Sequence, residues 1–118
     1  MLFSLKQEAP ASIGGSTFTG GEGYLKLSPI LQGEAEMYGK GRVFARTILD
    51  PGCAVGYHQH QGDSETFFIL KVHGDYNHDG QHVQVGPGDI AYCGDGEWHG
   101  MKNNADEPLE FIALILYK

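Results

Sequence analysis

The sequence predicts a single all-β domain from its turn-forming residues and its lack of helical periodicity. Its 118 residues include eighteen glycines and five prolines. They are spread along the chain, which is typical of many short strands joined by tight turns. Between residues 40 and 118, no segment keeps apolar residues at helical spacing for three turns without a Gly or Pro. We therefore expect roughly eight to ten short strands in a sandwich or barrel.

The first clear strand is expected at residues 42–49. RVFARTIL has the β-branched and aromatic content of a strand, and Asp50-Pro51-Gly52 is a turn that ends it. Residues 1–23 are irregular and predict an arm or a loose first strand. A short helix at residues 33–38 is a weaker alternative to a loop.

Four further segments complete the expected sheet structure. ETFFIL at 65–70 and IAYC at 90–93 are short strands, and residues 76–85 form a hairpin because Asp79-Gly80 suits a tight turn with positive φ. The last strand, at 109–117, is apolar at both alternating sets of positions. Such a strand must be covered on both faces.

Charge and composition exclude several classes of partner. The formal net charge is -7, so no basic stripe is available for nucleic acid or an anionic membrane. Lys6 and Glu8 interrupt the first apolar run, and the run at 111–117 is far shorter than the roughly 20 residues of a membrane span. Cys53 and Cys93 match neither a disulfide framework nor a CxxC motif. We expect free thiols and a cytoplasmic location.

A histidine pair and a glutamate lie close together in GYHQHQGDSETFF. His58 and His60 are two positions apart, so on a strand their imidazoles point to the same side. Residues 61–64 have turn character and would return the next strand antiparallel, which brings Glu65 to the same point. An isolated pair of this kind is more often a polar strand edge than a metal site.

A second segment, GDIAYCGDGEWHG, favours a metal site over a polar strand edge because it adds His99 after a glycine-rich corner. Three nitrogens and one oxygen suit Mn, Fe, Co, Ni, Cu or Zn, whereas Ca and Mg favour oxygen ligands. Four protein ligands on an octahedral ion would leave two positions for water or substrate, as in a reactive site.

The two segments resemble the two motifs of the cupin superfamily, G(X)5HXH(X)3-4E(X)6G and G(X)5PXG(X)2H(X)3N. Eight of the ten specified positions agree: Gly52, His58, His60, Glu65, Gly88, Gly96, His99 and Asn103. Two turn positions depart, because Val72 replaces the last glycine of the first motif and Gly94 replaces the proline of the second.

The resemblance implies a double-stranded β-helix, or jelly roll, in one cupin domain over 1–118. Residues 1–41 would supply the arm and first strands and 42–117 the barrel core. It implies one divalent transition metal, Mn, Fe, Ni or Zn, bound by His58, His60, Glu65 and His99. It also implies a homodimer, which the doubly apolar last strand favours independently.

Strand alternation indicates which residues could form the walls of a substrate pocket. Phe67 and Ile69 share a face with Glu65, and Met101 shares one with His99; each could equally be barrel core. Arg42 and Arg46 share a strand face, and an inward Arg46 would bind a carboxylate or phosphate, whereas an outward one would be solvated.

Several other residues have two interpretations. Tyr57 and Trp98 either line the mouth of the site or face away from it. The histidines outside the motif are expected to be solvated: His73, His78 and His82.

The function expected from the resemblance is an enzyme acting on a small polar organic molecule. Its metal would activate dioxygen or act as a Lewis acid, in oxygenase, decarboxylase, isomerase or lyase chemistry. The alternative is a binding or sensor module that holds a sugar, an acid or a metal without turnover. Apart from the metal ligands, the sequence places no second carboxylate or histidine clearly as a general base.

Overall fold

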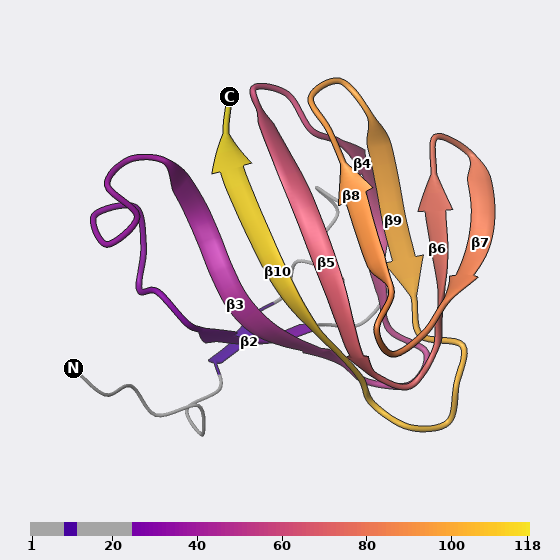
Figure 1. Cartoon of the computed structure of the whole chain (residues 1–118). Coiled ribbons are helices and arrows are strands. Elements are labelled where there is room, and N and C mark those ends of the chain that lie inside the picture. The colour runs from indigo at the N-terminus through magenta and orange to yellow at the C-terminus, as the bar shows by residue number, and fades with distance from the viewer. Residues whose placement is uncertain (1–8, 12–24) are drawn as a thin grey trace.

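The computed structural model describes residues 9–11 and 25–118, and these form strands, turns and loops without a helix. The strands are β1 Ala9–Ala11, β2 Leu25–Pro29, β3 Gly41–Leu49, β4 Ala54–Gln59, β5 Asp63–Lys71, β6 Gly74–His78, β7 Gln81–Val85, β8 Ile90–Cys93, β9 Trp98–Lys102 and β10 Leu109–Tyr117. The predicted all-β class is therefore confirmed (Figure 1). No described segment is a helix long and apolar enough to cross a membrane.

The strands form two sheets that pack face to face (Figure 1). One has the order β1-β2-β3-β10-β5-β8 and the other the order β4-β9-β6-β7, and every described pairing is antiparallel. Neighbours such as β3 and β10 are distant in sequence, as in a jelly roll. Side chains from the two inner faces meet between the sheets and form the core.

Strand β10 shows how the alternating pattern divides between core and surface. Leu109, Phe111, Ala113 and Ile115 point inward and are at most 5% exposed. The alternate residues, Ile112, Leu114 and Leu116, point to the outer face, where the first two are half-buried and Leu116 is 42% exposed. The apolar outer face is therefore only partly covered within one chain.

The other expectations concern the hairpin at 76–85, the segment at 33–38 and residues 1–23. Asp79 and Gly80 have φ values of 50° and 86°, so the predicted hairpin has two left-handed residues at its tip. The helix considered at residues 33–38 does not form; backbone bonds there close successive turns, which end where Tyr38 is left-handed with φ 53°. Of residues 1–23, the structure describes only β1, which pairs with β2.

Both departures from the cupin motifs fall at turns. Val72, where the first motif has glycine, is held at φ 71° between β5 and β6. This left-handed conformation costs a side chain about 1 to 2 kcal/mol, and a β-branched residue is rarely found there. The turn thus keeps the glycine conformation without the glycine.

Val72→Gly should therefore stabilise the protein. Relief of the left-handed strain, about 1 to 2 kcal/mol, exceeds the entropic cost of glycine, about 0.5 to 1 kcal/mol. We expect a gain in unfolding free energy of about 0.5 to 1 kcal/mol in urea denaturation. Val83→Gly is the control, because this 54% exposed residue of β7 has no left-handed φ and its replacement should destabilise. A loss of stability in Val72→Gly would contradict the strain.

Candidate metal centre

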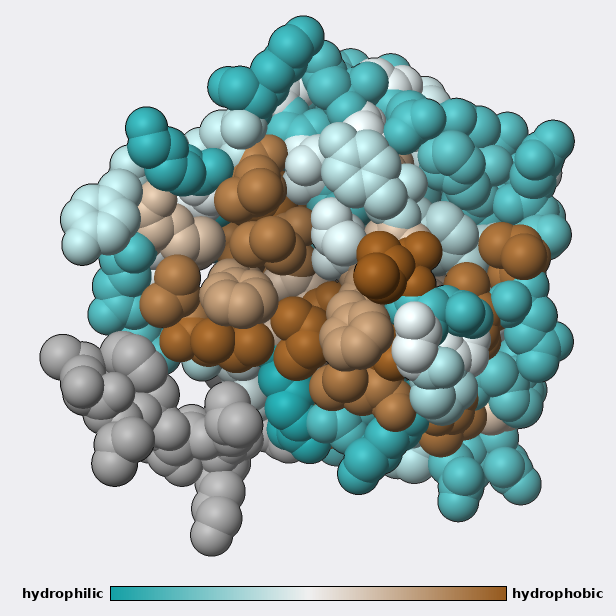
Figure 2. All heavy atoms as spheres, viewed as in Figure 1, coloured by the Kyte–Doolittle hydropathy of each residue, from teal (hydrophilic) through white to brown (hydrophobic). Residues whose placement is uncertain are grey.

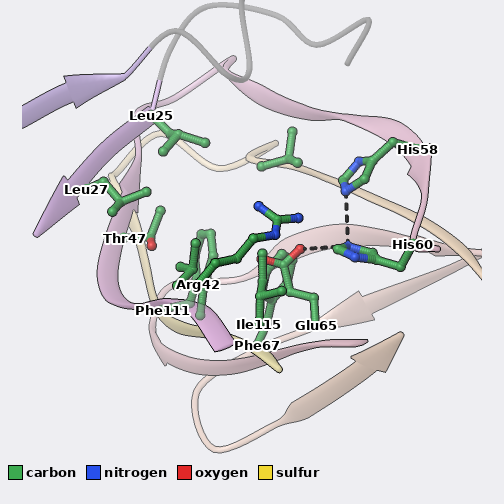
Figure 3. Close-up of a pocket in the computed structure, with 13 residues that line it drawn as sticks. Leu25, Leu27, Arg42, Thr47, His58, His60, Glu65, Phe67, Phe111 and Ile115 are labelled. Atoms are coloured by element: carbon green, nitrogen blue, oxygen red, sulfur yellow. Dashed lines mark hydrogen bonds and ion pairs between the residues drawn. The ribbon is translucent and has the colours of Figure 1, made fainter. Parts of the chain in front are cut away.

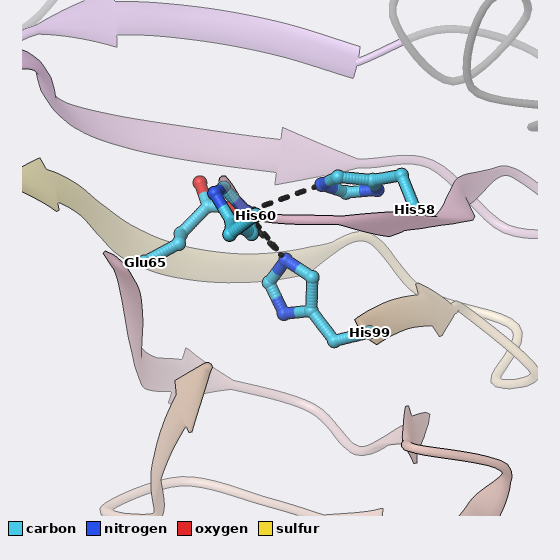
Figure 4. A group of neighbouring side chains, drawn as sticks. All are labelled: His58, His60, Glu65 and His99. Carbon is cyan, nitrogen blue, oxygen red and sulfur yellow. Dashed lines mark hydrogen bonds and ion pairs between the residues drawn. The ribbon is translucent and has the colours of Figure 1, made fainter. Parts of the chain in front are cut away.

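The four residues singled out by the two motifs meet between the sheets (Figure 4). His58 lies on β4, His60 directly follows that strand, and His99 lies on β9 of the same sheet. Glu65 reaches the cluster from β5 of the opposite sheet. His60, Glu65 and His99 are buried, while His58 is half-buried. The cluster therefore joins the two sheets and is open mainly beside His58.

A local irregularity in β4 sets the position of His58. The register between β4 and β9 shifts between Val55 and His58, and His58 is then paired with His99. The shift brings the backbone of β4 close to Gly100, where a Cβ atom would meet the Val55 oxygen at 3.0 Å. Glycine at this position allows the bulge, and the bulge directs His58 toward His99.

The donor atoms are spaced as the ligands of a metal ion would be. His60 Nε2 lies 3.3 Å from His58 Nε2, 3.1 Å from His99 Nε2 and 3.1 Å from Glu65 Oε1. Glu65 Oε1 is also 3.0 Å from His99 Nε2, and all four donors lie within 4.8 Å of one another. With bonds of about 2.1 Å, adjacent ligands of an octahedron are about 3.0 Å apart and opposite ones about 4.2 Å.

Hydrogen bonds on the other side of each ring fix the direction of these donors. His58 Nδ1 donates to the Gly56 carbonyl at 2.6 Å, and His60 Nδ1 donates to Asp63 Oδ1 at 2.8 Å. Both acceptors lack a proton of their own, so Nε2 of each neutral ring carries a lone pair. His99 Nδ1 contacts the Tyr76 hydroxyl at 2.8 Å.

These contacts direct lone pairs of nitrogen and carboxylate oxygen at one buried point, an arrangement that a cation or shared protons would stabilise. The donor set and its outer contacts therefore fit a divalent metal.

Burial and the hydrogen bonds within the cluster together set the pKa values of its residues. Burial alone would raise the pKa of Glu65, but hydrogen bonds with His60 and His99 outweigh it and lower the pKa to about 2. Burial likewise opposes charging of His60, yet its bonds to Glu65 and Asp63 raise its pKa above 6.5. For His58, burial prevails and lowers the pKa. Contacts within the cluster thus favour a proton on His60 and the anionic form of Glu65.

Two cavities meet at His58 and His60 of this cluster. An inner cavity of about 220 Å³ lies between the sheets, and its walls are mainly apolar (Figure 3). A wider outer cleft is lined by Tyr57, Gln59, Gln61, Asp63 and Trp98. Arg42, His58 and His60 line both. Arg42 therefore shares the lining of both cavities with two residues of the cluster, and apolar space lies beside them.

The predicted pocket residues do not all line the cavities. Phe67 lines the inner cavity, stacked 5.2 Å from the His99 ring. Ile69 and Met101 are buried in the core and do not line either cavity. Arg46 does not line them either: it forms an ion pair with Glu110 on the outer side of the large sheet. The outward alternative therefore describes Arg46, and Arg42 reaches the cavities instead.

A bulge explains why Arg42 and Arg46 differ although both are on β3. Along β10, Ile115 pairs with Val43 and Leu116 with Gly41, so Arg42 is the extra residue on β3. Such a residue is released from strict alternation and its side chain is redirected. Arg42 Nη2 then donates to Asp63 Oδ2 at 3.1 Å. The Asp63 carboxylate therefore accepts hydrogen bonds from both the Arg42 guanidinium and the His60 ring.

The other aromatic and histidine residues lie outside the cluster. Tyr57 and Trp98 stack with ring centroids 5.4 Å apart on the wall of the outer cleft. His82 and His73 are exposed, as expected. His78 is half-buried, and its Nε2 faces Glu97 Oε2 at 3.4 Å and Asp79 Oδ2 at 3.7 Å. Spacing along the sequence did not indicate this second group of three potential ligands.

The two cysteines remain reduced inside the fold. Cys53 and Cys93 are buried free thiols, as expected from the sequence. Neither lines the cavities described above. Burial raises the pKa of Cys93 to about 12, so this thiol stays protonated and unreactive.

Sequence reasoning missed three residues that lie around the candidate site. Asp63 and Tyr76 hold the Nδ1 atoms of His60 and His99, and Thr47 lines the inner cavity. Asp63, three positions after His60, was read only as part of a turn. Tyr76 and Thr47 carry no signal in the sequence, because their roles depend on strands paired across the fold.

Comparison with known proteins identifies the family. The Cupin domain family matches residues 45–115. The chain therefore belongs to the cupin family, whose double-stranded β-helix its two sheets form.

Similar proteins have been described in thermophilic bacteria. An oxalate-binding protein of Thermotoga maritima is 38% identical over 101 residues, which span 86% of this chain and 83% of that protein. A crystal structure described as a predicted oxalate decarboxylase, also from Thermotoga maritima, superimposes over the full length of both chains with TM-score 0.88 and 30% identity. TT1209 of Thermus thermophilus shares the fold, with TM-score 0.69 and 20% identity over 79% of this chain and 83% of that one.

Metal affinity should depend on pH through His60 and Asp63. Because a metal binds imidazoles without their Nε2 protons, affinity should rise with pH through 6.5 and level off only above the raised pKa of His60. Asp63→Asn removes a cause of that rise in pKa, so the levelling should move to lower pH. Loss of the orienting contact should also weaken affinity by about tenfold. Isothermal titration with Mn²⁺ at several pH values measures both effects.

Asp75→Asn is the matched control, because Asp75 also accepts from a histidine, His82 Nδ1 at 2.8 Å, but far from the cluster. It should leave the pH profile unchanged. An unchanged profile in Asp63→Asn would contradict the role of Asp63.

Proposed function

We propose that this cupin binds a small carboxylic acid through one divalent transition metal held by His58, His60, Glu65 and His99. The observation that carries the proposal is the convergence of their four donor atoms, all within 4.8 Å of one another, in a cavity that Arg42 also lines. When bound, the metal would act as a Lewis acid that accepts carboxylate oxygens and neutralises their charge. Mn, Fe, Ni and Zn all suit the donor set.

Arg42 supports a carboxylate as the ligand group. It is the one Arg or Lys that lines the cavities in the described part of the chain. Its guanidinium can form paired, charge-assisted hydrogen bonds with a planar carboxylate. In the free protein it is held by Asp63 and is 46% exposed, so a ligand can reach it from the outer cleft.

Similar proteins point to the same ligand class. One relative is an oxalate-binding protein and another is described as a predicted oxalate decarboxylase. Oxalate has two planar carboxylates, one of which could lie on the metal while the other meets Arg42. Oxalate is thus the first ligand to test.

Oxalate binding should require both the metal and Arg42. Removing the metal with a chelator should abolish binding, and Arg42→Gln should weaken it by about tenfold to a hundredfold, the value of a hydrogen bond to a charged group. Arg46→Gln is the control, since Arg46 pairs with Glu110 outside the cavities. Calorimetry on the Mn²⁺-loaded protein measures each affinity. Equal affinities in the two arginine variants would contradict the assignment.

Decarboxylation of the same ligand is the second candidate function, favoured by the relative described as a predicted decarboxylase. This reaction needs a proton delivered to the carbon that loses carbon dioxide. In the described part of the chain, Glu65 and Asp63 are the only carboxylates that line the cavities. Glu65 is a ligand candidate and Asp63 is bonded to Arg42 and His60. Binding without turnover therefore has the stronger support.

Incubation of the metal-loaded protein with oxalate, under air and under nitrogen, separates these functions. Formate and carbon dioxide in equal amounts would identify a decarboxylase, whereas carbon dioxide without formate, formed only under air, would identify oxidation of oxalate by dioxygen. Tight binding without product is the result expected for a binding protein.

We also propose a homodimer formed through the outer face of the six-stranded sheet. Figure 2 shows apolar residues running across this face. They include the exposed side chains Phe68, Ile90, Tyr92 and Leu116. An apolar patch of this kind on a soluble protein is commonly an interface. Pairing would also cover the outer side of β10.

Ile90→Asp should therefore convert the dimer to a monomer. Ile90 is 68% exposed, so a charge there costs little in one chain but is unfavourable inside an interface. Light scattering coupled to gel filtration gives the mass. Val83→Asp is the control, because Val83 is 54% exposed on the other sheet. A monomeric wild-type protein, or an unchanged dimer in Ile90→Asp, would contradict this interface.

A further inference from the structure

The inner cavity contains a buried hydroxyl that has no partner. Thr47 on β3 lines the cavity and is 2% exposed, and its Oγ1 makes no hydrogen bond in the described structure. A buried hydroxyl left unpaired costs about 1 to 3 kcal/mol. Buried polar groups in native proteins nearly always have a partner. Thr47 Oγ1 is thus available to a partner that the described residues do not provide.

Thr47 lies at the end of the cavity away from the metal cluster. Figure 3 shows it grouped with Leu25 and Leu27, on the opposite side from His58 and His60. On β3 it is four residues beyond Val43, or about 13 Å of strand. Val43 pairs with Ile115, and Ile115 pairs with Glu65, so Val43 marks the level of the metal cluster.

The surroundings of Thr47 restrict what its partner can be. Its strand neighbours are Leu27 on β2 and Phe111 on β10, and both line the same cavity. A charged group here would lose its hydration without meeting an opposite charge, because Arg42 is bonded to Asp63 beside His60. A hydroxyl, amide or carbonyl oxygen would instead gain a hydrogen bond at little cost.

We propose that Thr47 is a specificity-determining residue that binds the neutral polar end of a ligand longer than oxalate. This ligand class is a carboxylic acid with an apolar stem and a terminal hydroxyl or amide, long enough to reach from the metal cluster to Thr47, whose levels on β3 are about 13 Å apart. The carboxylate lies at the metal and Arg42, the stem lies against the apolar walls, and the terminal group pairs with Thr47 Oγ1. The inference rests on the proposed function, since the metal site anchors the carboxylate.

Calorimetry of the Mn²⁺-loaded protein with four acids tests this arrangement: oxalate, hexanoate, 6-hydroxyhexanoate and adipate. Wild-type protein should bind 6-hydroxyhexanoate about threefold to tenfold more tightly than hexanoate, the value of one neutral hydrogen bond. It should bind adipate more weakly than 6-hydroxyhexanoate, because adipate would place a charge beside Thr47.

Thr47→Val should remove this preference and leave the affinities for hexanoate and oxalate unchanged, since valine keeps the shape of threonine. Thr66→Val, on the outer face of β5, should behave as wild type.

A second measurement does not depend on any ligand. If Thr47 Oγ1 is unpaired in the free protein, Thr47→Val should raise the Tm of the metal-free protein. A lower Tm would mean that the hydroxyl is already satisfied, and would overturn the assignment.

Three calorimetric results would overturn it as well: equal wild-type affinities for hexanoate and 6-hydroxyhexanoate, a preference that persists in Thr47→Val, or adipate as the tightest ligand. If oxalate binds without such a preference, only this inference fails; if no acid binds, the proposed function fails with it.

Discussion

The convergence of four lone-pair donors on one buried point is the constraint on which the rest of this structure depends. Three imidazole nitrogens and a carboxylate oxygen lie 3.0 to 3.3 Å apart along the cluster. Without a cation or protons between them, such atoms repel. The fold holds them in place by hydrogen bonds at each Nδ1, made by Gly56, Asp63 and Tyr76. These outer contacts determine which ring nitrogen faces the centre.

The two-sheet architecture makes this arrangement rigid. The three histidines belong to the small sheet and its edge, and Glu65 belongs to the large one, so the cluster forms only when the sheets pack. Asn103 strengthens the same region from outside the cluster. It is fully buried, and its Nδ2 donates to the carbonyls of Leu49 and Glu107. The asparagine of the second motif therefore fixes a loop to β3 and has no part in the donor set.

Irregular positions in the strands and turns determine where the side chains of the site point. The bulge in β4 directs His58, and the bulge opposite β10 directs Arg42 toward the cavities. At Gly94, where the motif has proline, the backbone N–H donates to Glu97 Oε1 at 2.6 Å, a bond that proline could not make. Val72 keeps a left-handed turn without glycine. At both positions the chain forms its turn without the residue that the family motif has.

The sequence by itself determined the all-β class, the strands at 42–49, 65–70, 90–93 and 109–117, the hairpin at 76–85 and the four-residue cluster. These follow from local chemistry: turn residues, alternation, and ligand types at fixed spacing in two motifs. It did not determine which arginine enters the site, because Arg42 and Arg46 share a strand face until a bulge separates them. Nor could it identify Thr47, Asp63 or Tyr76, whose roles depend on strands distant in sequence. Only packing of the two sheets decides which side chains face the cavity and leaves the Thr47 hydroxyl there without a partner among the described residues.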